Sequence, residues 1–317
     1  MKINKELPDV DLVYLWVNGN DPEWLKKKES FTGEAPENNA MDCKARYIDN
    51  DELRHSLRAI EKNAPWLRKI FIVTDNQIPN WLNTDNPKIK IIDHKEILPS
   101  QILPCFNSVV IEHHLHLIPD LSEYFIYAND DMFINRAVTL EDFFTQDGKP
   151  IVRLNRRWFR KLWLNYRVKV KKQHLDNYNL TMHRAATLVE QKLGKYIGHK
   201  PHHNVDSYRK SYYEETYNLF KNDIEATLSN HLRNDSDIQR IIYSLTPIVQ
   251  NKAKIKFVGD KTSFRCHIEK QHYLKDLIRK NPKFFCVNDS HYATDNDRKN
   301  VKELLENKFP DKSQFEK

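Results

Sequence analysis

The chain has 317 residues, a formal net charge of +7, 39 % hydrophobic residues and 30 % charged residues. This composition excludes a mostly disordered chain, and the length is sufficient for one large core or for a core with an insertion. With six glycines and neither a G-x-G-x-x-G nor a G-x-x-x-x-G-K-[ST] segment, phosphate binding would have to rely on side chains, metal or helix ends.

The first strong pattern along the chain is a series of apolar runs in the N-terminal half. Strands are predicted at four of them: residues 10–17, 69–75, 88–93 and 124–128. A helix is predicted between the first two, with Asp49 as its N-cap and Glu52 three residues later. This alternation predicts an α/β fold with a mainly parallel sheet over residues 1–154.

The second half of the chain reads differently. Residues 155–250 are mostly helical in pattern and are predicted to form a helical insertion folded back over the sheet. A closing strand is predicted at 254–259 and an amphipathic helix near the C-terminus, within residues 251–317. Because no repeat or low-complexity linker separates these parts, we expect residues 1–317 to form a single domain.

Polar residues follow three of the predicted strands. The strand at 124–128 runs into Asn129, Asp130 and Asp131, and Asn18-Gly19 and Asp75-Asn76 follow two others. In parallel sheets ligands bind at the carboxyl ends of the strands, and adjacent carboxylates suit Mg²⁺ or Mn²⁺ with a bound diphosphate. Taken alone, an Asp-Asp pair at a strand end is more often a turn or a helix cap than a catalytic site.

Three further segments carry candidate site residues, each with an ordinary structural alternative. GHKPHHN contains His199, His202 and His203, which suit proton transfer or simply a surface loop. Arg233 can clamp a phosphoryl group, although the acidic residues after it also fit a helix cap. Asn288, at the end of FFCVN, can join the same edge of the sheet or form an Asx-turn.

The segment from Arg153 to Lys172 contains nine Lys or Arg residues and no acidic residue, interleaved with aromatic residues. It suits a polyanion or an anionic membrane surface, and the alternative is a helix with a solvated basic face. We predict that it holds a polyanionic acceptor, through Arg156, Arg157 and Arg160.

The cysteines bear on the cellular compartment. Cys43, Cys105, Cys266 and Cys286 are widely spaced and form no C-x-x-C pair, which favours reduced thiols. The N-terminus has no long apolar segment, and no run approaches the roughly 18 apolar residues that cross a bilayer. We therefore expect a cytoplasmic protein, either soluble or attached peripherally to the inner face of the membrane.

Taken together, these segments resemble a known family. Residues 11–22, 46–83 and 103–133, the GHKPHH and RNDSD segments, and residues 284–289 resemble the four conserved regions of the Stealth family. That family includes bacterial capsular polysaccharide hexose-1-phosphate transferases and the catalytic part of the lysosomal-enzyme N-acetylglucosamine-1-phosphotransferase. The resemblance spans nearly the whole chain.

The resemblance implies a GT-A-like (Rossmann-like) domain that transfers a sugar 1-phosphate, such as N-acetylhexosamine 1-phosphate, from a UDP-sugar to a glycan hydroxyl. UMP leaves, and a phosphodiester of a capsular or extracellular polysaccharide forms. Mg²⁺ or Mn²⁺ is the expected cofactor, and no nucleic acid is expected as a partner. The alternatives are a Leloir glycosyltransferase that releases UDP and a non-enzymatic polyanion-binding protein.

The resemblance also implies roles for individual residues. Catalysis is expected from Asp130, Asp131, His199, His202 and Arg233, with Asp130, Asp131 and Asn288 as metal ligands. The donor site is expected to contain Asp11, Trp16, Asn18, Gly19, Glu112 and Asn129, and Asp75 joins it from the strand-end pattern.

Overall fold

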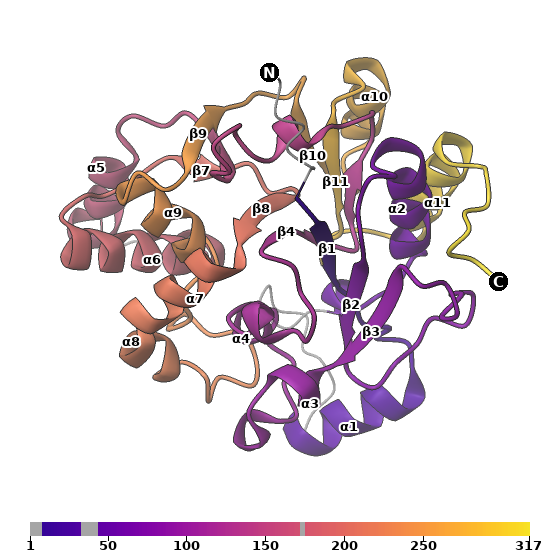
Figure 1. The fold of residues 1–317 in the computed structure, drawn as a ribbon, viewed down its shortest axis with the longest axis horizontal. Helices are drawn as coiled ribbons and strands as arrows, with labels where there is room; N and C mark the ends of the chain where they lie inside the picture. Colours follow the sequence, from indigo (N-terminus) through magenta and orange to yellow (C-terminus); the bar gives the residue numbers. More distant parts are fainter. Residues whose placement is uncertain (1–7, 33–43, 172–174) are drawn as a thin grey trace, which may run out of the picture.

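The fold is centred on a five-stranded sheet. In the computed structural model, which describes residues 8–32, 44–171 and 175–317, the strand order is β3-β2-β1-β4-β8 (Figure 1). Their bounds are β1 (Val10–Leu15), β2 (Ile70–Thr74), β3 (Ile89–Asp93), β4 (Tyr124–Asn129) and β8 (Asp206–Arg209). The first four run parallel and β8 is antiparallel to β4, which confirms the predicted α/β class with a mainly parallel sheet.

Helices cover both faces of this sheet (Figure 1). In chain order they are α1 (Pro22–Thr32), α2 (Glu52–Asn63), α3 (His94–Ile97), α4 (Ser108–Glu112), α5 (Arg160–Asn165), α6 (Asn177–Leu193), α7 (Lys210–Leu219), α8 (Lys221–Glu225), α9 (Ile242–Val249), α10 (Gln271–Lys280) and α11 (Asp295–Lys308). Alternate residues of β1 enter two cores. Leu12 and Tyr14 pack in the core that contains α2, whereas Val13 and Leu15 pack in the core that contains α4, α6, α7 and α9.

Two smaller sheets extend the molecule. One has the order β10-β11-β5 and the other β7-β6-β9. Their bounds are β5 (Met132–Ile134), β6 (Ile151–Asn155), β7 (Lys200–Pro201), β9 (Lys254–Phe257), β10 (Ser263–His267) and β11 (Phe284–Asn288). Because β5 follows β4 after only two residues, the chain leaves the central sheet at Asp130 and Asp131 and joins β11 directly.

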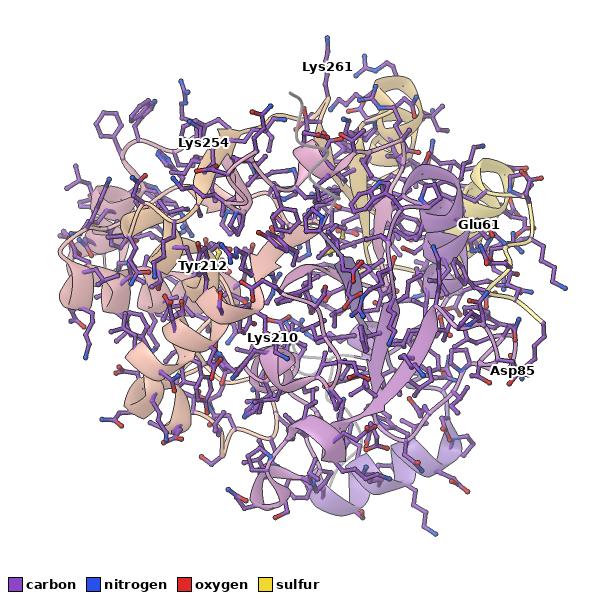
Figure 2. The ribbon with its side chains drawn as sticks, in the orientation of Figure 1. Glu61, Asp85, Lys210, Tyr212, Lys254 and Lys261 are labelled. Carbon is purple, nitrogen blue, oxygen red and sulfur yellow. The ribbon has the colours of Figure 1, made fainter. Side chains whose placement is uncertain are left out.

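The segment 155–250 differs from the predicted helical insertion. It contributes β7 and β8 as well as α5 to α9, and β8 is the edge strand of the central sheet. The predicted strand near residue 254 is present as β9, but it pairs with β6 and does not close the central sheet. Figure 2 shows these two sides of the molecule, with Tyr212 and Lys254 on one and Glu61 and Asp85 on the other.

The predicted start of α2 is wrong by two residues. Asp51, with φ of 65°, occupies the N-cap and makes no side-chain capping bond, and the Asp49 side chain accepts a hydrogen bond from the Asp51 amide at 3.0 Å. The left-handed Asp51 turns the chain sharply before the helix begins. Glu52 accepts from the amide of Asn50 at 2.6 Å, so neither Asp49 nor Glu52 caps the helix in the predicted way.

No helix within the described ranges is both long enough and apolar enough to cross a membrane. Cys105, Cys266 and Cys286 are buried and free in the described part of the chain. Cys43 lies outside the described residues.

Candidate active site

The candidate site lies where the strand order of the central sheet reverses. The chain passes from β1 to β2 and β3 on one side and returns with β4 on the other side of β1. Leu15 lies opposite Asn129 in the register, so the residues that follow these strands leave the sheet side by side. Such reversal points are where open α/β sheets bind ligands.

A first pocket opens at this point. Its lining contains the predicted residues Trp16, Asn129, Asp130 and Arg233 together with residues from the loops after β1, before α2 and before α4. The additional lining residues are Leu15, Val17, Trp24, Arg46, Tyr47, Val73, His94, Cys105, Phe106, Ser108 and Ile111. Aromatic and aliphatic side chains with a few charged groups suit a nucleotide base, ribose and phosphate.

Gly19 positions one wall of the first pocket. Its amide donates to the carbonyl oxygen of Tyr47 at 2.6 Å, and a Cβ at residue 19 would lie 2.3 Å from the Cβ of Tyr47. The two backbones therefore approach each other at a distance that only glycine permits. The ring of Tyr47 packs against Trp24 with centroids 5.1 Å apart, so Gly19 acts on the pocket through Tyr47.

Four carboxylates gather beside the first pocket. Asp130 faces Asp131, Asp49 and Glu52, and the pKa of Asp130 is raised well above its ordinary value by desolvation and then by these neighbours. Burial also raises the pKa of Asp49 to about 6 and that of Glu52 to about 7. Burial and mutual repulsion disfavour the charged forms of these carboxylates, and a divalent cation bound beside them would stabilise those forms.

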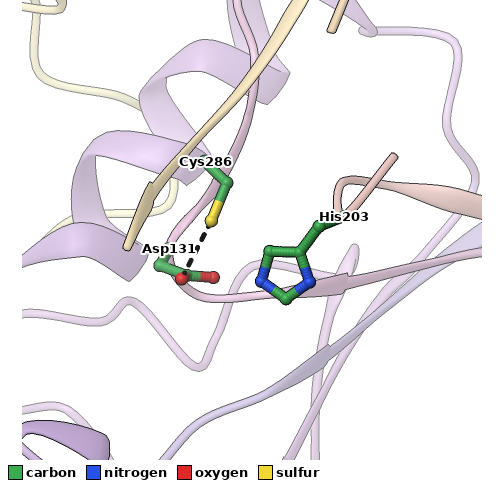
Figure 3. A group of neighbouring side chains, drawn as sticks. All are labelled: Asp131, His203 and Cys286. Atoms are coloured by element: carbon green, nitrogen blue, oxygen red, sulfur yellow. Dashed lines mark hydrogen bonds between the residues drawn. The ribbon is translucent and has the colours of Figure 1, made fainter. Parts of the chain in front are cut away.

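Asp131, His203 and Cys286 form a group of side chains that could hold a metal ion (Figure 3). One ligand atom each from Asp131, His203 and Cys286 lies within 4.8 Å of the others. Oδ1 of Asp131 is buried and has no hydrogen-bond partner, whereas Oδ2 accepts from the Cys286 thiol at 3.1 Å. Burial raises the pKa of that thiol well above its ordinary value, so Cys286 is a protonated hydrogen-bond donor to Asp131.

The ligand atoms of these residues can therefore be compared with the preferences of the expected cation. Mg²⁺ and Mn²⁺ prefer oxygen ligands, which Asp130 and Asp131 supply, and Mn²⁺ also accepts an imidazole such as that of His203. Asn288 fits less well, because its Oδ1 accepts two hydrogen bonds from the Arg265 guanidinium, the longer at 3.1 Å. The group whose ligand atoms lie close enough together to share a cation contains Asp131 and His203 but not Asp130, so Asp131 is the carboxylate of the pair that could hold a cation.

A second pocket adjoins the first. It is lined by Glu112, Asp206, Arg240 and His203, together with Ser108, Val109, Asn129, Met132, Tyr178, Met182, Pro201, Tyr208, Arg233, Gln239 and Ile241. Ser108, Asn129 and Arg233 line both pockets. Arg233 donates to the Ser108 hydroxyl at 2.7 Å, which orients its guanidinium at the junction of the two pockets.

Buried charges organise the second pocket. Arg240 lies over the ring of Tyr127 at 4.1 Å, 3.1 Å from Asp206 and 3.5 Å from Glu112. Burial alone would raise the pKa of Asp206, but Arg240 and His202 lower it to about 2. Nε of Arg240 and Oε2 of Glu112 are buried 3.5 Å from each other and make no hydrogen bond, so the two charges are held as an ion pair in the lining of the second pocket.

The three histidines of GHKPHHN occupy three different environments. His199 accepts from the amide of Arg157 and packs against Trp158 and Phe257, and it lines neither pocket. Nδ1 of His202 is 2.6 Å from the Ser263 hydroxyl and its ring is buried beside Asp206.

His203, which was not among the predicted catalytic residues, is the member of this group that enters the second pocket. Its φ of 53° turns the chain between His202 and Asn204. Burial, then Arg265 and Arg240, lower the pKa of His203 well below its ordinary value, so the imidazole is neutral near pH 7.

Two predicted donor residues lie behind the pockets. Asp11 is fully buried near the start of β1, where its carboxylate accepts from Arg68 at 2.9 and 2.5 Å. It is four residues from Leu15, about 13 Å along the strand. Asp75 pairs with Lys27 at 2.5 Å beneath His94 and does not line either pocket.

Asn18 has a supporting place as well. Its backbone N–H and C=O exchange hydrogen bonds with the Gln77 side chain at 3.0 Å each, and this ties the loop after β1 to the loop after β2. Glu112 does line the second pocket and lies 2.8 Å from the Tyr127 hydroxyl. The structure thus brings Trp16, Glu112, Asn129, Asp130 and Arg233 together and leaves Asp11, Asn18 and Asp75 around them.

The predicted acceptor arginines separate into two kinds. Arg156 and Arg157 are exposed, and the Arg156 guanidinium lies over the ring of Phe257 at 4.5 Å. Arg160 is buried and donates to Asn179 at 2.9 Å, and Arg153 is buried between Phe143 and Phe284. Arg160 is therefore occupied by a contact within the fold, which removes it from the exposed surface predicted to bind an acceptor.

Comparison with known proteins addresses the identity of the chain. Three family models match it: Stealth protein CR1, conserved region 1, over residues 8–34; Stealth protein CR2, conserved region 2, over 46–152; and Stealth protein CR4, conserved region 4, over 276–317. It is also 33 % identical to the exopolysaccharide phosphotransferase cps2G of Lactiplantibacillus plantarum, over 98 % of this chain and 96 % of that protein. The chain belongs to the Stealth family. The predicted family membership is confirmed.

Other relatives show the same breadth of similarity. This Stealth protein is 34 % identical to the capsular polysaccharide phosphotransferase LcbA of Aeromonas hydrophila over 97 % of this chain and 86 % of the relative. It is 30 % identical to the capsular polysaccharide phosphotransferase WcwK of Streptococcus pneumoniae, over 98 % of this chain and 99 % of the relative. Among solved structures, the galactosyltransferase LgtC aligns over 94 % of this chain and 95 % of its own, with 10 % identity and a TM-score of 0.43.

Proposed function

We propose that this Stealth protein transfers a sugar 1-phosphate, such as N-acetylhexosamine 1-phosphate, from a UDP-sugar to a hydroxyl of a glycan. The acceptor oxygen attacks the phosphorus that carries the sugar, and the bond from that phosphorus to the oxygen of UMP breaks. The hydroxyl proton passes to a base of the protein and UMP leaves. The new linkage is a phosphodiester of a capsular or extracellular polysaccharide.

The observation that carries this proposal is the pair of adjoining pockets with Arg233 at their junction. The first pocket lies at the strand-order reversal and suits the uridine, and the second suits the sugar and the acceptor. A guanidinium between them lies where a diphosphate would pass from one to the other, and it can bind two phosphate oxygens at once. Relatives that are similar to this chain over 86 to 99 % of their own length are named phosphotransferases, which supports the same reaction class.

Roles for the other residues follow from their placement. Asp131, with Asp130 next to it in the chain, is proposed to hold Mg²⁺ or Mn²⁺, which when bound supplies neutralisation of the diphosphate charge. His203 is proposed to accept the proton of the acceptor hydroxyl, because it lies in the second pocket as a neutral imidazole. Arg240 and Glu112, which pair with each other at 3.5 Å, are proposed to bind hydroxyls of the sugar or the acceptor from the lining of the second pocket.

The identity of the released nucleotide tests the reaction. The protein is incubated with a panel of UDP-sugars, Mg²⁺ and a short glycan. The released nucleotides are then separated and identified, and the mass of the glycan is measured by mass spectrometry. We expect UMP and a glycan heavier by one sugar and one phosphate. Release of UDP with a gain of sugar alone would establish the Leloir alternative. Salt-sensitive binding of polyanions without turnover of any UDP-sugar would establish the non-enzymatic one.

A further inference from the structure

The surface most unlike that of an ordinary soluble domain is the segment of residues 156–171, here called the docking segment. Of the twelve large hydrophobic side chains that are exposed in the described residues, six lie in this segment. They are Trp158, Phe159, Leu162, Trp163, Tyr166 and Val170. Phe159 and Trp158 are 75 % and 71 % exposed, respectively. Contiguous apolar surface of this kind marks a place of contact.

The segment is held to the body of the protein while its apolar side chains face outward. Leu164 is fully buried, Arg160 donates to Asn179 of α6, and Lys161 pairs with Glu190 of the same helix. These contacts fix one side of α5 and of the single π-helical turn that follows it, Tyr166–Val170. The exposed side chains therefore belong to an anchored element.

Positive charge borders the apolar side chains. The segment contains seven Lys or Arg residues and no acidic residue. The guanidinium of Arg156 lies 5.4 Å from the ring of Trp158, and the ammonium of Lys171 lies 5.7 Å from the ring of Tyr166. Exposed aromatic and aliphatic side chains surrounded by cations are the composition that inserts at the interface of a bilayer with anionic headgroups.

Other occupants fit these observations less well. A phosphodiester glycan could pair with the cations and stack its sugar rings on the aromatic rings, but it offers no hydrocarbon phase into which Leu162 and Val170 could be removed from water. A second copy docked through the same face would bring two sets of cations together without any acidic partner from the segment. We propose that the docking segment binds the surface of an anionic lipid bilayer, with Trp158, Phe159 and Leu162 in the interfacial region and Arg156 and Arg157 at the lipid phosphates.

The docking segment also lies next to the second pocket. The amide of Arg157 donates to His199, which precedes β7, and β7 pairs with β6 at Asn155 and Leu154. Pro201, the second residue of β7, and His203 line the second pocket. Docking would thus hold the acceptor side of the site near the bilayer, where a membrane-attached glycan is presented. This last consequence rests on the proposed function, whereas membrane binding itself does not.

Vesicle sedimentation tests the proposal. Wild-type protein is mixed with vesicles of phosphatidylcholine alone or with added phosphatidylglycerol, and we expect sedimentation with the anionic vesicles only. The variant Trp158→Ser/Phe159→Ser/Leu162→Ser should lose binding by about tenfold or more, because each side chain removes apolar area from water on insertion. The variant Ile278→Ser/Tyr292→Ser, which alters exposed hydrophobic residues elsewhere, should bind like the wild type.

Further outcomes separate this proposal from its rivals and from the proposed function. Turnover of a UDP-sugar with a short soluble glycan, without vesicles, should be equal in the wild type and the triple variant. Equal vesicle binding by both would overturn the proposal. So would a loss of use of the soluble glycan in the triple variant, which would assign the segment to the acceptor. A wild-type dimer in light scattering that becomes a monomer in the triple variant would assign it to a second copy. If no UDP-sugar is turned over while the vesicle results hold, only the proposed function fails.

Discussion

The two pockets bury charged side chains, whereas the docking segment exposes apolar ones. Around the pockets, charged groups such as Arg240 and Asp206 are withdrawn from water, and carboxylates lie close to one another. In the docking segment, Trp158 and Phe159 stand in water although they are among the most apolar side chains available. Each arrangement is unfavourable for folding alone, so each indicates an interaction with something outside the chain. The pockets require a charged, polar ligand, and the segment requires an apolar surface with anionic groups.

The largest expected effect in this comparison is the loss of a carboxylate at the pockets. Asp131→Asn should lower the turnover of a UDP-sugar by about a thousandfold, equivalent to about 4 kcal/mol, because a ligand for the cation and its charge are removed. Asp85→Asn, on the exposed loop labelled in Figure 2, is the matched control and should turn over like the wild type.

Two outcomes are informative here. The circular dichroism spectrum of Asp131→Asn should match that of the wild type. Its unfolding temperature should be equal or higher, because a buried charge is lost. Turnover within a factor of two of the wild type would show that Asp131 is structural.

The next largest effect concerns the buried charges of the second pocket. Arg240→Met should lower the free energy of unfolding by roughly 3 kcal/mol, because Asp206 and Glu112 would remain buried without their cation. Arg279→Met removes an arginine whose side chain is 75 % exposed in its pair with Asp276 and should change stability by less than about 0.5 kcal/mol. Equal urea midpoints for Arg240→Met and the wild type would contradict the assigned network.

A smaller effect is expected from the wall of the first pocket. Gly19→Ala places a Cβ 2.3 Å from Tyr47, so the segment that carries Tyr47 must shift. We expect the KM for the UDP-sugar to rise about tenfold with a smaller change in kcat, since binding is weakened more than the reaction step. Gly259→Ala meets no atom within 4 Å and should leave both constants unchanged. If the two variants behave alike, the contact between Gly19 and Tyr47 does not shape the donor pocket.

A further effect is a pH dependence of stability. In the folded protein the pKa of Glu52 is raised by burial from 4.5 to about 7, so the folded state holds a proton that the unfolded state releases. This contribution to stability is complete below about pH 4.5 and is lost as the pH rises to about 7. In chelator, Glu52→Gln should therefore show a smaller fall in urea midpoint between about pH 5 and pH 8 than the wild type does.

Asp49 and Asp131, whose pKa values are also raised, act in the same direction and should leave some dependence in this variant. Glu303→Gln, on the exposed face of α11, is the control and should follow the wild type. A steeper fall in Glu52→Gln than in the wild type would contradict the assigned burial of that carboxylate.

The sequence predicted the elements that have a strong pattern of their own. The runs at 10–17, 69–75, 88–93 and 124–128 correspond to β1 to β4, because strands buried on both faces are continuously apolar. The short strands β5, β7 and β8 were not predicted. They have two to four residues and are defined by their pairing partners, which a local pattern does not contain.

The candidate site was predicted in the same uneven way. Asn129 and Asp130 could be predicted at a strand end, because parallel topology brings carboxyl ends together, whereas Trp16 was expected only from the family resemblance. The placement of His203, rather than His199 or His202, in the second pocket depends on the left-handed backbone of His203 itself, which the spacing of the histidines does not reveal. Arg240 was missed because its importance comes from Glu112 and Asp206, which are distant in the sequence.

The fate of the β-phosphate of the donor tests the central claim most directly. A UDP-sugar carrying radioactive phosphorus in that position is supplied with a short glycan, and the label is followed into the glycan and the nucleotide. We predict that the wild type moves the label into the glycan, that Asp131→Asn moves very little, and that Asp85→Asn matches the wild type. Label retained in UDP while the glycan grows would contradict phosphosugar transfer.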